Sequence, residues 1–270
     1  MSDTGPAGTS ADRRLALVTG AAQGLGLATA RRLASDGFTV LLGDLDEGLA
    51  ADAAAGLVDE GLDVAALRVD VADDASVAAC IERVADRSHT LDVLVNNAGI
   101  ISRQPAESFE SAQWDREIGV NLGGTMRCSR AAYPLMLHAA APAIVNLASV
   151  GSTFGLPHRL AYSTAKTGVV GLTRTLAAEW GKRGIRVNAV APGYMESPMM
   201  LGGLERGVLD RDRLLSRTPL MRFGHADEVA SVISFLVSSD ASFVTGVCLA
   251  VDGGITIDGT FHVDESYKSL

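Results

Sequence analysis

The chain has 270 residues, 47% of them hydrophobic, with 29 glycines and 8 prolines, a composition that suits one large core with many tight turns in a single domain. Its formal net charge of −9 argues against nucleic-acid binding, which needs a basic face. No apolar run approaches the roughly 18 residues that a membrane span requires, so we expect no membrane partner.

The first twelve residues are rich in Gly, Ser, Thr, Asp and Pro and contain no apolar signal core. We therefore expect residues 1–12 to be a disordered leader and residues 13–254 to form the domain. The apolar run 15–18 predicts a short strand, and a helix is predicted over 25–35, ended by Gly37 in the position that a helix C-cap favours.

The turn between this strand and this helix has the pattern T-G-x-x-x-G-x-G, from Thr19 to Gly26. Strand, glycine turn and helix in this order are typical of a dinucleotide-binding site. The glycines let the backbone approach a pyrophosphate, and the helix N-terminus supplies free N–H groups. A purely structural turn would show the same glycines, so the motif needs support from the rest of the chain.

The second predicted strand, 38–43, is followed by Asp44, eighteen residues beyond the last glycine of the motif. An acidic residue there would hydrogen-bond the adenosine ribose hydroxyls of NAD and repel the 2′-phosphate of NADP. No Arg or Lys lies in 23–27 or 44–50 to receive that phosphate, so we predict NAD as the cofactor. Asp46 is better placed than Asp44 to cap the helix that follows.

Two further strands end in polar residues. The strand predicted over 64–69 is followed by Asp70 and Val71, and the strand over 91–95 runs into Asn96-Asn97-Ala98-Gly99. These residues are compatible with simple turns. Because the carboxyl ends of strands in a doubly wound sheet form the ligand crevice, they are also a candidate cofactor wall.

The middle of the chain supplies the candidate catalytic residues. Asn121 lies inside a predicted helical run, 114–138, and Ser149 follows an apolar run, 143–148, that predicts a buried strand. An asparagine at this place would ordinarily be a solvated helix residue. The Ser149 hydroxyl lies where strand ends display functional groups.

Tyr162 and Lys166 lie one turn apart in a predicted helix, 161–180. Residues four apart share a helix face, so we expect the ammonium to lower the pKa of the phenol from about 10. A phenol tuned in this way suits proton transfer at a hydroxyl or carbonyl. Taken alone, the pair has the spacing of an ordinary amphipathic surface pair.

The last third contains a predicted strand, 186–191, closed by Pro192-Gly193, then a segment, 199–223, without a firm period. A helix over 226–238 and a strand over 247–251 complete the pattern. The tail, 255–270, shows no helix pattern. It is either disordered or packed across a subunit boundary.

The motifs in this order resemble the short-chain dehydrogenase/reductase family over about Arg14 to Gly254. The resemblance implies an α/β fold, a Rossmann-type doubly wound sheet of seven parallel strands in a single domain, in homotetramers or homodimers. The segment 199–223 resembles the mobile substrate lid of this family.

The resemblance also assigns roles to the candidate residues. Tyr162 would be the general acid/base, Lys166 would lower its pKa and hold the nicotinamide ribose, Ser149 would hydrogen-bond the reacting oxygen, and Asn121 would hold a water linking Lys166 to solvent. The implied cofactor contacts are Gly20, Gln23, Gly24, Leu25, Gly26, Asp44, Leu45, Asp70, Val71, Asn97, Ala98, Gly99, Tyr162, Lys166, Pro192, Gly193, Met195 and Ser197.

A substrate pocket is inferred from position alone. Its expected lining is mostly apolar: Ile101, Gly151, Leu156, His158, Tyr194, Met199 and Leu201. His158 is expected to pack in its loop rather than act in catalysis, because Tyr162 already fills the acid/base role.

The cysteines and histidines point away from metal chemistry. Cys80, Cys128 and Cys248 are odd in number and lie in apolar surroundings, which predicts buried reduced thiols in a cytoplasmic protein. The five histidines show no pairing at ligand spacing, so we predict no catalytic metal.

The sequence therefore predicts an oxidoreductase that interconverts a secondary alcohol (a small alcohol, polyol or sugar) and its ketone, with NAD as cofactor and a small molecule as its partner. Two alternatives stay open: a 3-oxoacyl-thioester reductase acting on acyl carrier protein, and a catalytically silent NAD-binding protein. The first would normally use NADP, and the second need not retain Ser149, Tyr162 and Lys166.

Overall fold

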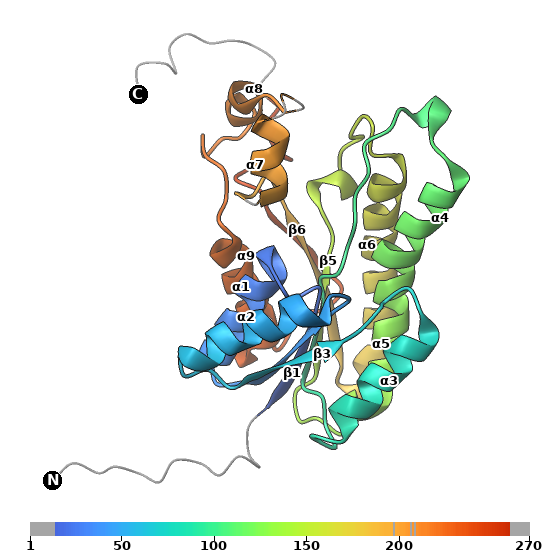
Figure 1. Ribbon diagram of the computed structural model, residues 1–270, viewed down its shortest axis with the longest axis vertical. Coiled ribbons are helices and arrows are strands. Elements are labelled where there is room, and N and C mark those ends of the chain that lie inside the picture. Colours follow the sequence, from blue (N-terminus) through green and yellow to red (C-terminus); the bar gives the residue numbers. More distant parts are fainter. Residues whose placement is uncertain (1–13, 197, 206, 208, 260–270) are drawn as a thin grey trace, which may run out of the picture.

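The computed structural model describes residues 14–196, 198–205, 207 and 209–259, so the predicted leader and residues 260–270 of the tail lie outside it. The described chain forms one parallel sheet of seven strands in the order β3-β2-β1-β4-β5-β6-β7 (Figure 1). The strands are β1 (Leu15–Thr19), β2 (Thr39–Asp44), β3 (Val64–Arg68), β4 (Val93–Asn96), β5 (Ala143–Leu147), β6 (Arg186–Pro192) and β7 (Cys248–Val251). The predicted fold class is confirmed.

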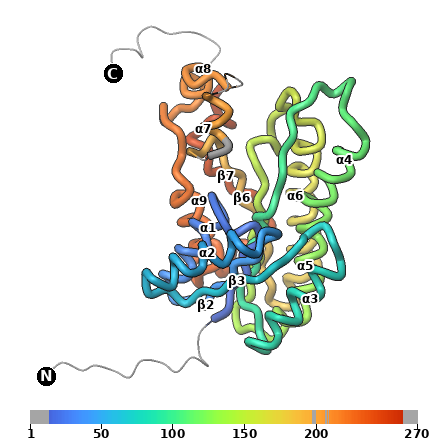
Figure 2. Tube along the Cα trace, in the orientation of Figure 1, coloured from blue at the N-terminus to red at the C-terminus, as the bar shows by residue number. Residues whose placement is uncertain are grey.

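Helices cover both faces of the sheet (Figure 1). One face carries α1 (Gly24–Ser35), α2 (Glu47–Asp59) and α9 (Ala226–Val237), and the other carries α3 (Asp74–Ala85), α4 (Ser111–Ile118), α5 (Thr125–Met136) and α6 (Leu160–Trp180). Two short helices, α7 (Pro198–Glu205) and α8 (Arg211–Ser216), lie together beyond the end of the sheet (Figure 2).

The strands are apolar throughout because both of their faces are buried. In β1, Leu15 and Leu17 pack into the cluster that contains α3 and α5, whereas Ala16 and Val18 pack into the cluster that contains α1 and α9. Successive side chains of a strand point to opposite faces, so a sheet covered by helices on both sides needs apolar residues at every position. This explains why the sequence shows continuous apolar runs rather than alternation.

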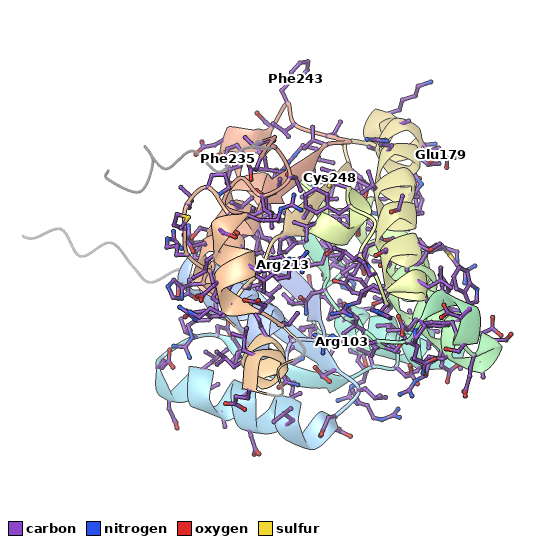
Figure 3. The ribbon with its side chains drawn as sticks, turned by 90° about the horizontal axis from the view of Figure 1, so that it is seen from above. Arg103, Glu179, Arg213, Phe235, Phe243 and Cys248 are labelled. Atoms are coloured by element: carbon purple, nitrogen blue, oxygen red, sulfur yellow. The ribbon has the colours of Figure 1, made fainter. Side chains whose placement is uncertain are left out.

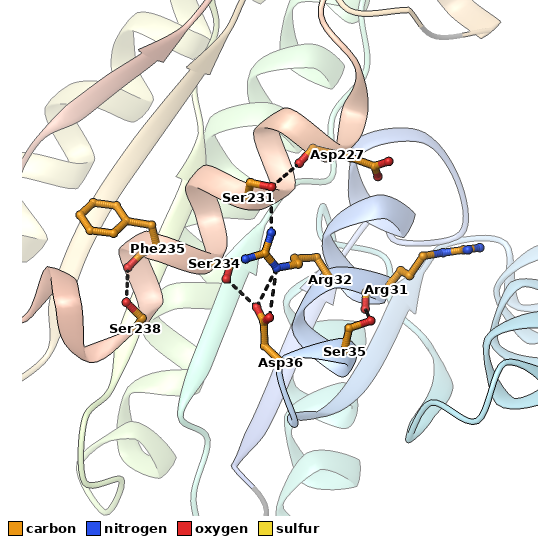
Figure 4. A network of polar contacts seen from close by, with 9 residues as sticks. All are labelled: Arg31, Arg32, Ser35, Asp36, Asp227, Ser231, Ser234, Phe235 and Ser238. Carbon is orange, nitrogen blue, oxygen red and sulfur yellow. Dashed lines mark hydrogen bonds and ion pairs between the residues drawn. The ribbon is translucent and has the colours of Figure 1, made fainter.

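A polar network joins α1 to α9 over the first of these faces (Figure 4). The Arg32 guanidinium donates from Nε to both oxygens of Asp36, at 3.1 and 3.0 Å, and from Nη1 to Ser231 Oγ at 2.8 Å. Ser234 Oγ donates to Asp36 Oδ2 at 2.5 Å. The network fixes the C-terminal end of α1 against α9.

The strand order reverses between β1 and β4, which are neighbours in the sheet, because α1 and α2, before β3, and α3 to α6, after it, lie on opposite faces. Ligands of open α/β sheets bind at the carboxyl ends of the strands beside such a switch point. The fold therefore brings together the glycine turn after β1, Asp44, and the Asn96–Gly99 segment after β4.

Two segments differ from the sequence prediction. The helical run predicted over 114–138 begins at Ser111 and contains a π-helix, Gly119–Gly124, between α4 and α5. The segment 199–223, which shows no firm period, contains α7 and α8. Within the described residues, no helix combines the length and the apolar character needed to cross a bilayer.

Candidate active site

A cavity of about 1170 Å³ opens at the carboxyl ends of the strands. Most of the predicted cofactor contacts line it: Gly20, Gln23, Gly24, Leu25, Asp44, Leu45, Asp70, Val71, Asn97, Ala98, Gly99, Pro192, Gly193 and Met195. Ser149, Tyr162 and Lys166 line the same cavity. The structure thus gathers the nucleotide motif and the candidate catalytic side chains around one space.

The predicted substrate lining is found in part. Ile101, Leu156, His158 and Tyr194 line the cavity, and Met200 and Leu209 lie beside them. Gly151 and Leu201 are not among the lining residues: Gly151 lies behind Ser149, to whose hydroxyl its N–H donates at 3.1 Å, and Leu201 is exposed. Ser197 and the side chain of Met199 lie outside the described part of the chain.

The glycine turn is held in shape by Asn97. Its side-chain Nδ2 donates to the carbonyls of Thr19, at 3.0 Å, and Gly20, at 2.8 Å. Gly20 has a φ of +64°, and a Cβ on Gly26 would lie 2.1 Å from Gly20 O, so neither position accepts a side chain. Gly26 therefore lies beneath the turn and permits its close packing rather than lining the cavity.

The mouth of this turn suits a phosphate group. Gly24 has a φ of +59°, and a Cβ there would meet nothing within 4 Å, so the backbone faces open space. The N-cap residue of α1, Gln23, makes no side-chain capping hydrogen bond. The first N–H groups of α1 are thus left for a ligand, and with the dipole of the helix they favour an anion such as a pyrophosphate.

Asp44, the last residue of β2, is fixed beside this turn. Its Oδ2 accepts from Ala22 N–H at 3.0 Å and its Oδ1 from Asp46 N–H at 3.2 Å. The cap of α2 is Asp46, whose Oδ1 accepts from Leu49 N–H at 3.0 Å. Asp44 is therefore not the helix cap, and it lines the cavity beside the glycine turn.

Tyr162 and Lys166 extend from one face of α6 toward the end of β5. Lys166 is buried, and its Nζ donates to Leu147 O at 2.6 Å and lies 5.9 Å from the centroid of the Tyr162 ring. Ser149 is the N-cap of a 3₁₀ turn, Val150–Ser152, and a hydrogen bond from its hydroxyl favours the charged form of the Tyr162 phenol. The predicted grouping of these three side chains is thus present.

The prediction that Tyr162 has a lowered pKa because of Lys166 is wrong. Burial raises the pKa of the Tyr162 phenol, and the Ser149 hydrogen bond and the positive charge of Arg159 lower that pKa only in part. Burial also lowers the pKa of Lys166 to about 8. Spacing on a helix reports which groups are neighbours but not how deeply they lie, and here desolvation is the larger effect.

Asn121 lies in the π-helix rather than on a solvated α-helix. Its side chain is fully buried and pairs with the backbone of Ile100: Oδ1 accepts from the N–H at 3.0 Å and Nδ2 donates to the carbonyl at 2.8 Å. A Cβ on Gly99 would lie 2.6 Å from Asn121 Oδ1 and 3.6 Å from Lys166 Nζ. Asn121, Gly99 and Lys166 are therefore closely packed. Short π-helical segments of this kind are frequent at functional sites.

Sequence reasoning missed three arginines that line the cavity near Tyr162: Arg103, Arg116 and Arg159. Arg159 lies three residues before Tyr162, one turn away once the helix is assumed, and that spacing was a usable signal. For Arg103 the only signal was its place shortly after the N-N-A-G segment.

In the described part of the chain, no cluster of three or more His, Cys, Asp or Glu side chains is placed to hold a metal ion. Burial raises the pKa of Cys80 to about 11 and that of Cys128 to about 12. Both thiols are thus neutral near pH 7 and poor nucleophiles.

Comparison with known proteins gives consistent results. Residues 20–256 match the model of a family described as enoyl-(acyl carrier protein) reductase. A cis-4-hydroxycyclohexanecarboxylate dehydrogenase of Sinomonas cyclohexanicum is 46% identical over 244 residues, 90% of this chain and 96% of that protein. A 3-oxoacyl-[acyl-carrier-protein] reductase of Thermotoga maritima is 39% identical over 250 residues, 90% of this chain and 98% of that protein.

A solved structure gives the same family relationship as the sequence comparisons. A crystal structure of a gluconate 5-dehydrogenase from Burkholderia cenocepacia J2315, in complex with NADP and tartrate, superposes with a TM-score of 0.86 and 37% identity, covering 91% of this chain and 96% of that one.

Proposed function

Because the chain belongs to the short-chain dehydrogenase/reductase family, we propose that it interconverts a secondary alcohol and its ketone, with NAD as the hydride carrier and Tyr162 as the general acid/base. The family and the dehydrogenases among its relatives make it an oxidoreductase that acts on CH–OH groups with a nicotinamide cofactor. The choice of NAD, the alcohol and the residue roles are our proposal.

One observation carries the proposal: the Tyr162 phenol, hydrogen-bonded to Ser149 and close to Lys166, lines the same cavity as the glycine turn. A proton-transfer group and a nucleotide site in one cavity are what alcohol oxidation by a nicotinamide requires. A silent nucleotide-binding protein would have no need for this polar group.

The residues divide the work as follows. NAD, when bound by the glycine turn, Asp44 and Lys166, supplies the acceptor for the hydride. Tyr162 takes the proton of the substrate hydroxyl, or returns it to a ketone. Ser149 donates a hydrogen bond to the reacting oxygen and so holds the substrate in register with the phenol. Asn121, which packs with Lys166 around Gly99, holds a water that links Lys166 to solvent.

The preference for NAD is supported by the fixed Asp44 carboxylate, since family membership alone leaves the choice open: the gluconate 5-dehydrogenase structure contains NADP. We expect Asp44→Ala to weaken NAD binding by about tenfold or more, because a hydrogen bond to the ribose is removed. The discrimination against NADP should also fall by about tenfold or more, because a charge that repels the 2′-phosphate is removed. Measuring kcat/KM for both cofactors tests this. An unchanged NAD-to-NADP ratio would place the selector elsewhere.

The reaction itself is tested by following the absorbance of NADH with NAD or NADP and a panel of cyclic alcohols, polyols and 3-oxoacyl thioesters. The proposal predicts NAD-dependent oxidation of at least one secondary alcohol. Turnover of thioesters alone, with NADPH, would instead support the second candidate, which the Thermotoga maritima relative favours.

The raised pKa of Tyr162 predicts opposite pH profiles for the two directions. Near neutral pH the phenol is protonated and ready to donate to a ketone, but it must lose its proton before it can accept one from an alcohol. We expect kcat/KM for oxidation to rise from about pH 6 to about pH 9, with a limiting slope of about tenfold per unit, and that for reduction not to rise. A flat oxidation profile over that range would count against Tyr162 as the base.

Assembly into a homotetramer or homodimer, in the cytoplasm, is also part of the proposal. Exposed apolar side chains gather near the open edge strand β7, among them Val247, Leu249 and Phe243, the last fully exposed. An exposed edge strand presents unpaired backbone groups and apolar side chains to another chain, which supports an interface at this edge.

A further inference from the structure

Two loops far apart in sequence are joined at the rim of the cavity. The backbone of Gln104 pairs with Arg159, and Gln104 N–H donates to the carbonyl of His158 at 3.2 Å. His158 adopts a φ of 61°, an unusual conformation for a residue other than glycine, and this turns the chain into α6. The pairing places Arg103 and Arg159 close together, and both line the cavity.

Neither arginine is neutralised. Among the described residues, no carboxylate forms an ion pair with Arg103 or Arg159, and Arg103 Nε is buried without a hydrogen-bond partner. The Arg103 guanidinium extends toward α7, where its Nη2 lies 3.6 Å from the position that a Cβ on Gly203 would take (Figure 3). Burial, and then the charge of Arg103, lower the pKa of Arg159. Two partly buried like charges destabilise each other, and a bound anion would remove that cost.

The buried Glu117 offsets only part of this charge. Its Oε1 already accepts from Ser102 N–H at 2.8 Å and from Gln113 Nε2 at 3.0 Å, and its charge reaches Arg159. One carboxylate against two guanidiniums leaves an excess of positive charge, to which Arg116 adds from α4. Among the buried atoms of the described residues that have no partner, Arg103 Nε is a donor, whereas Gln104 Oε1 and Glu117 Oε2 are acceptors. A buried guanidinium N–H left unpaired beside a cavity fits an anionic ligand.

The charges divide the cavity into two ends. Asp44 and Asp70 line it beyond β2 and β3, on the nucleotide side, whereas the arginines line it on the β4–β5 side. Arg159 lies close enough to Tyr162 to influence its ionisation. A small molecule with its hydroxyl at Tyr162 would therefore place a second group near the guanidiniums.

We propose that the substrate is an organic anion, a small hydroxy acid or its keto acid, whose carboxylate is bound by Arg103 and Arg159 while its secondary hydroxyl meets Tyr162 and Ser149. This rests on the function proposed above and adds the substrate class. Two guanidiniums offer charge-assisted hydrogen bonds to both oxygens of a carboxylate, which fixes the far end of the molecule and orients the carbinol carbon.

The test compares an acid with its isosteric neutral amide: kcat/KM of the NAD-dependent enzyme for 4-hydroxycyclohexanecarboxylate and for 4-hydroxycyclohexanecarboxamide. We expect the wild-type protein to prefer the acid by about 30-fold or more, and Arg103→Gln to reduce the acid-to-amide ratio by about 10- to 100-fold. A thermal unfolding temperature of Arg103→Gln within about 3 °C of the wild type shows that the variant folds. Arg103→Lys should recover part of the preference.

Arg159→Gln should reduce the same ratio, although Arg159 also influences Tyr162, so Arg103→Gln is the cleaner variant. Arg87→Gln removes an exposed arginine outside the cavity lining and is expected to leave the ratio unchanged. A wild-type ratio near one, or a ratio that neither cavity variant changes, would overturn the assignment. The assignment would also be overturned if the two cavity variants reduced kcat/KM for an acetoacetyl thioester but left kcat/KM for the acid unchanged.

Binding measured by titration calorimetry separates this inference from the proposed reaction. In the presence of NADH, cyclohexanecarboxylate should bind about 30-fold more tightly than cyclohexanecarboxamide, and Arg103→Gln should remove the difference. Such binding without turnover of any alcohol would reject the proposed reaction and keep the anion site. Equal binding of acid and amide would reject the anion site whatever the turnover.

Discussion

Replacing Tyr162 by phenylalanine should reduce turnover by about 10²- to 10⁴-fold while NADH binding stays nearly intact. The change deletes one oxygen and keeps the ring, so the packing of the ring against the cavity wall is retained. Only the proton route is lost, together with the bond to the Ser149 hydroxyl. The effect is expected on kcat in both directions.

Steady-state kinetics and a fluorescence titration with NADH measure the two quantities separately. Tyr133→Phe is the matched control, because Tyr133 lies on α5 with its ring 4.8 Å from that of Trp180 and does not line the cavity. It should leave both quantities unchanged. Normal turnover in Tyr162→Phe would remove the phenol from the mechanism.

Replacing Gly26 by alanine should abolish tight NADH binding and lower the free energy of unfolding by about 1–3 kcal/mol. The added Cβ would lie 2.1 Å from Gly20 O and 2.5 Å from Asn97 Nδ2, and the first of these atoms belongs to backbone that has no room to move. The turn must shift, and with it the N–H groups that are expected to meet the pyrophosphate.

Gly56→Ala provides the comparison for this variant. Gly56 is exposed on α2, and a Cβ there would meet nothing within 4 Å, so alanine should raise stability by about 0.5–1 kcal/mol and leave binding alone. Thermal unfolding and NADH titration of both variants give the result. If Gly26→Ala binds NADH like the wild type, the glycine turn is not the nucleotide site.

The fold and the nucleotide end of the site were predictable from the sequence because their signals are local. A strand buried on both faces is a continuous apolar run, as in β1, and its end is marked by the first polar residue, as at Asp44. The glycine turn adds positions such as Gly20 where only glycine has the required backbone freedom. Each of these features is fixed by residues within one strand, turn and helix.

The features that sequence missed depend on contacts across the chain. Arg103 and Arg159 come close together through the pairing of Gln104 with Arg159, 55 residues apart, which no local pattern shows. The raised pKa of Tyr162 depends on burial, whereas helix spacing shows only its neighbour Lys166. The π-helix at Asn121 changes the register of an otherwise regular helical run, and apolar periodicity is too coarse to detect this.

The most direct test of the mechanism is a crystal structure of the protein with NAD bound. It should show the nicotinamide at the Tyr162 end of the cavity, with the phenol oxygen facing nicotinamide C4 across a space that accepts a small alcohol. A phenol oxygen turned away from the nicotinamide, or a nicotinamide packed so closely against Tyr162 that no substrate fits between them, would contradict the mechanism.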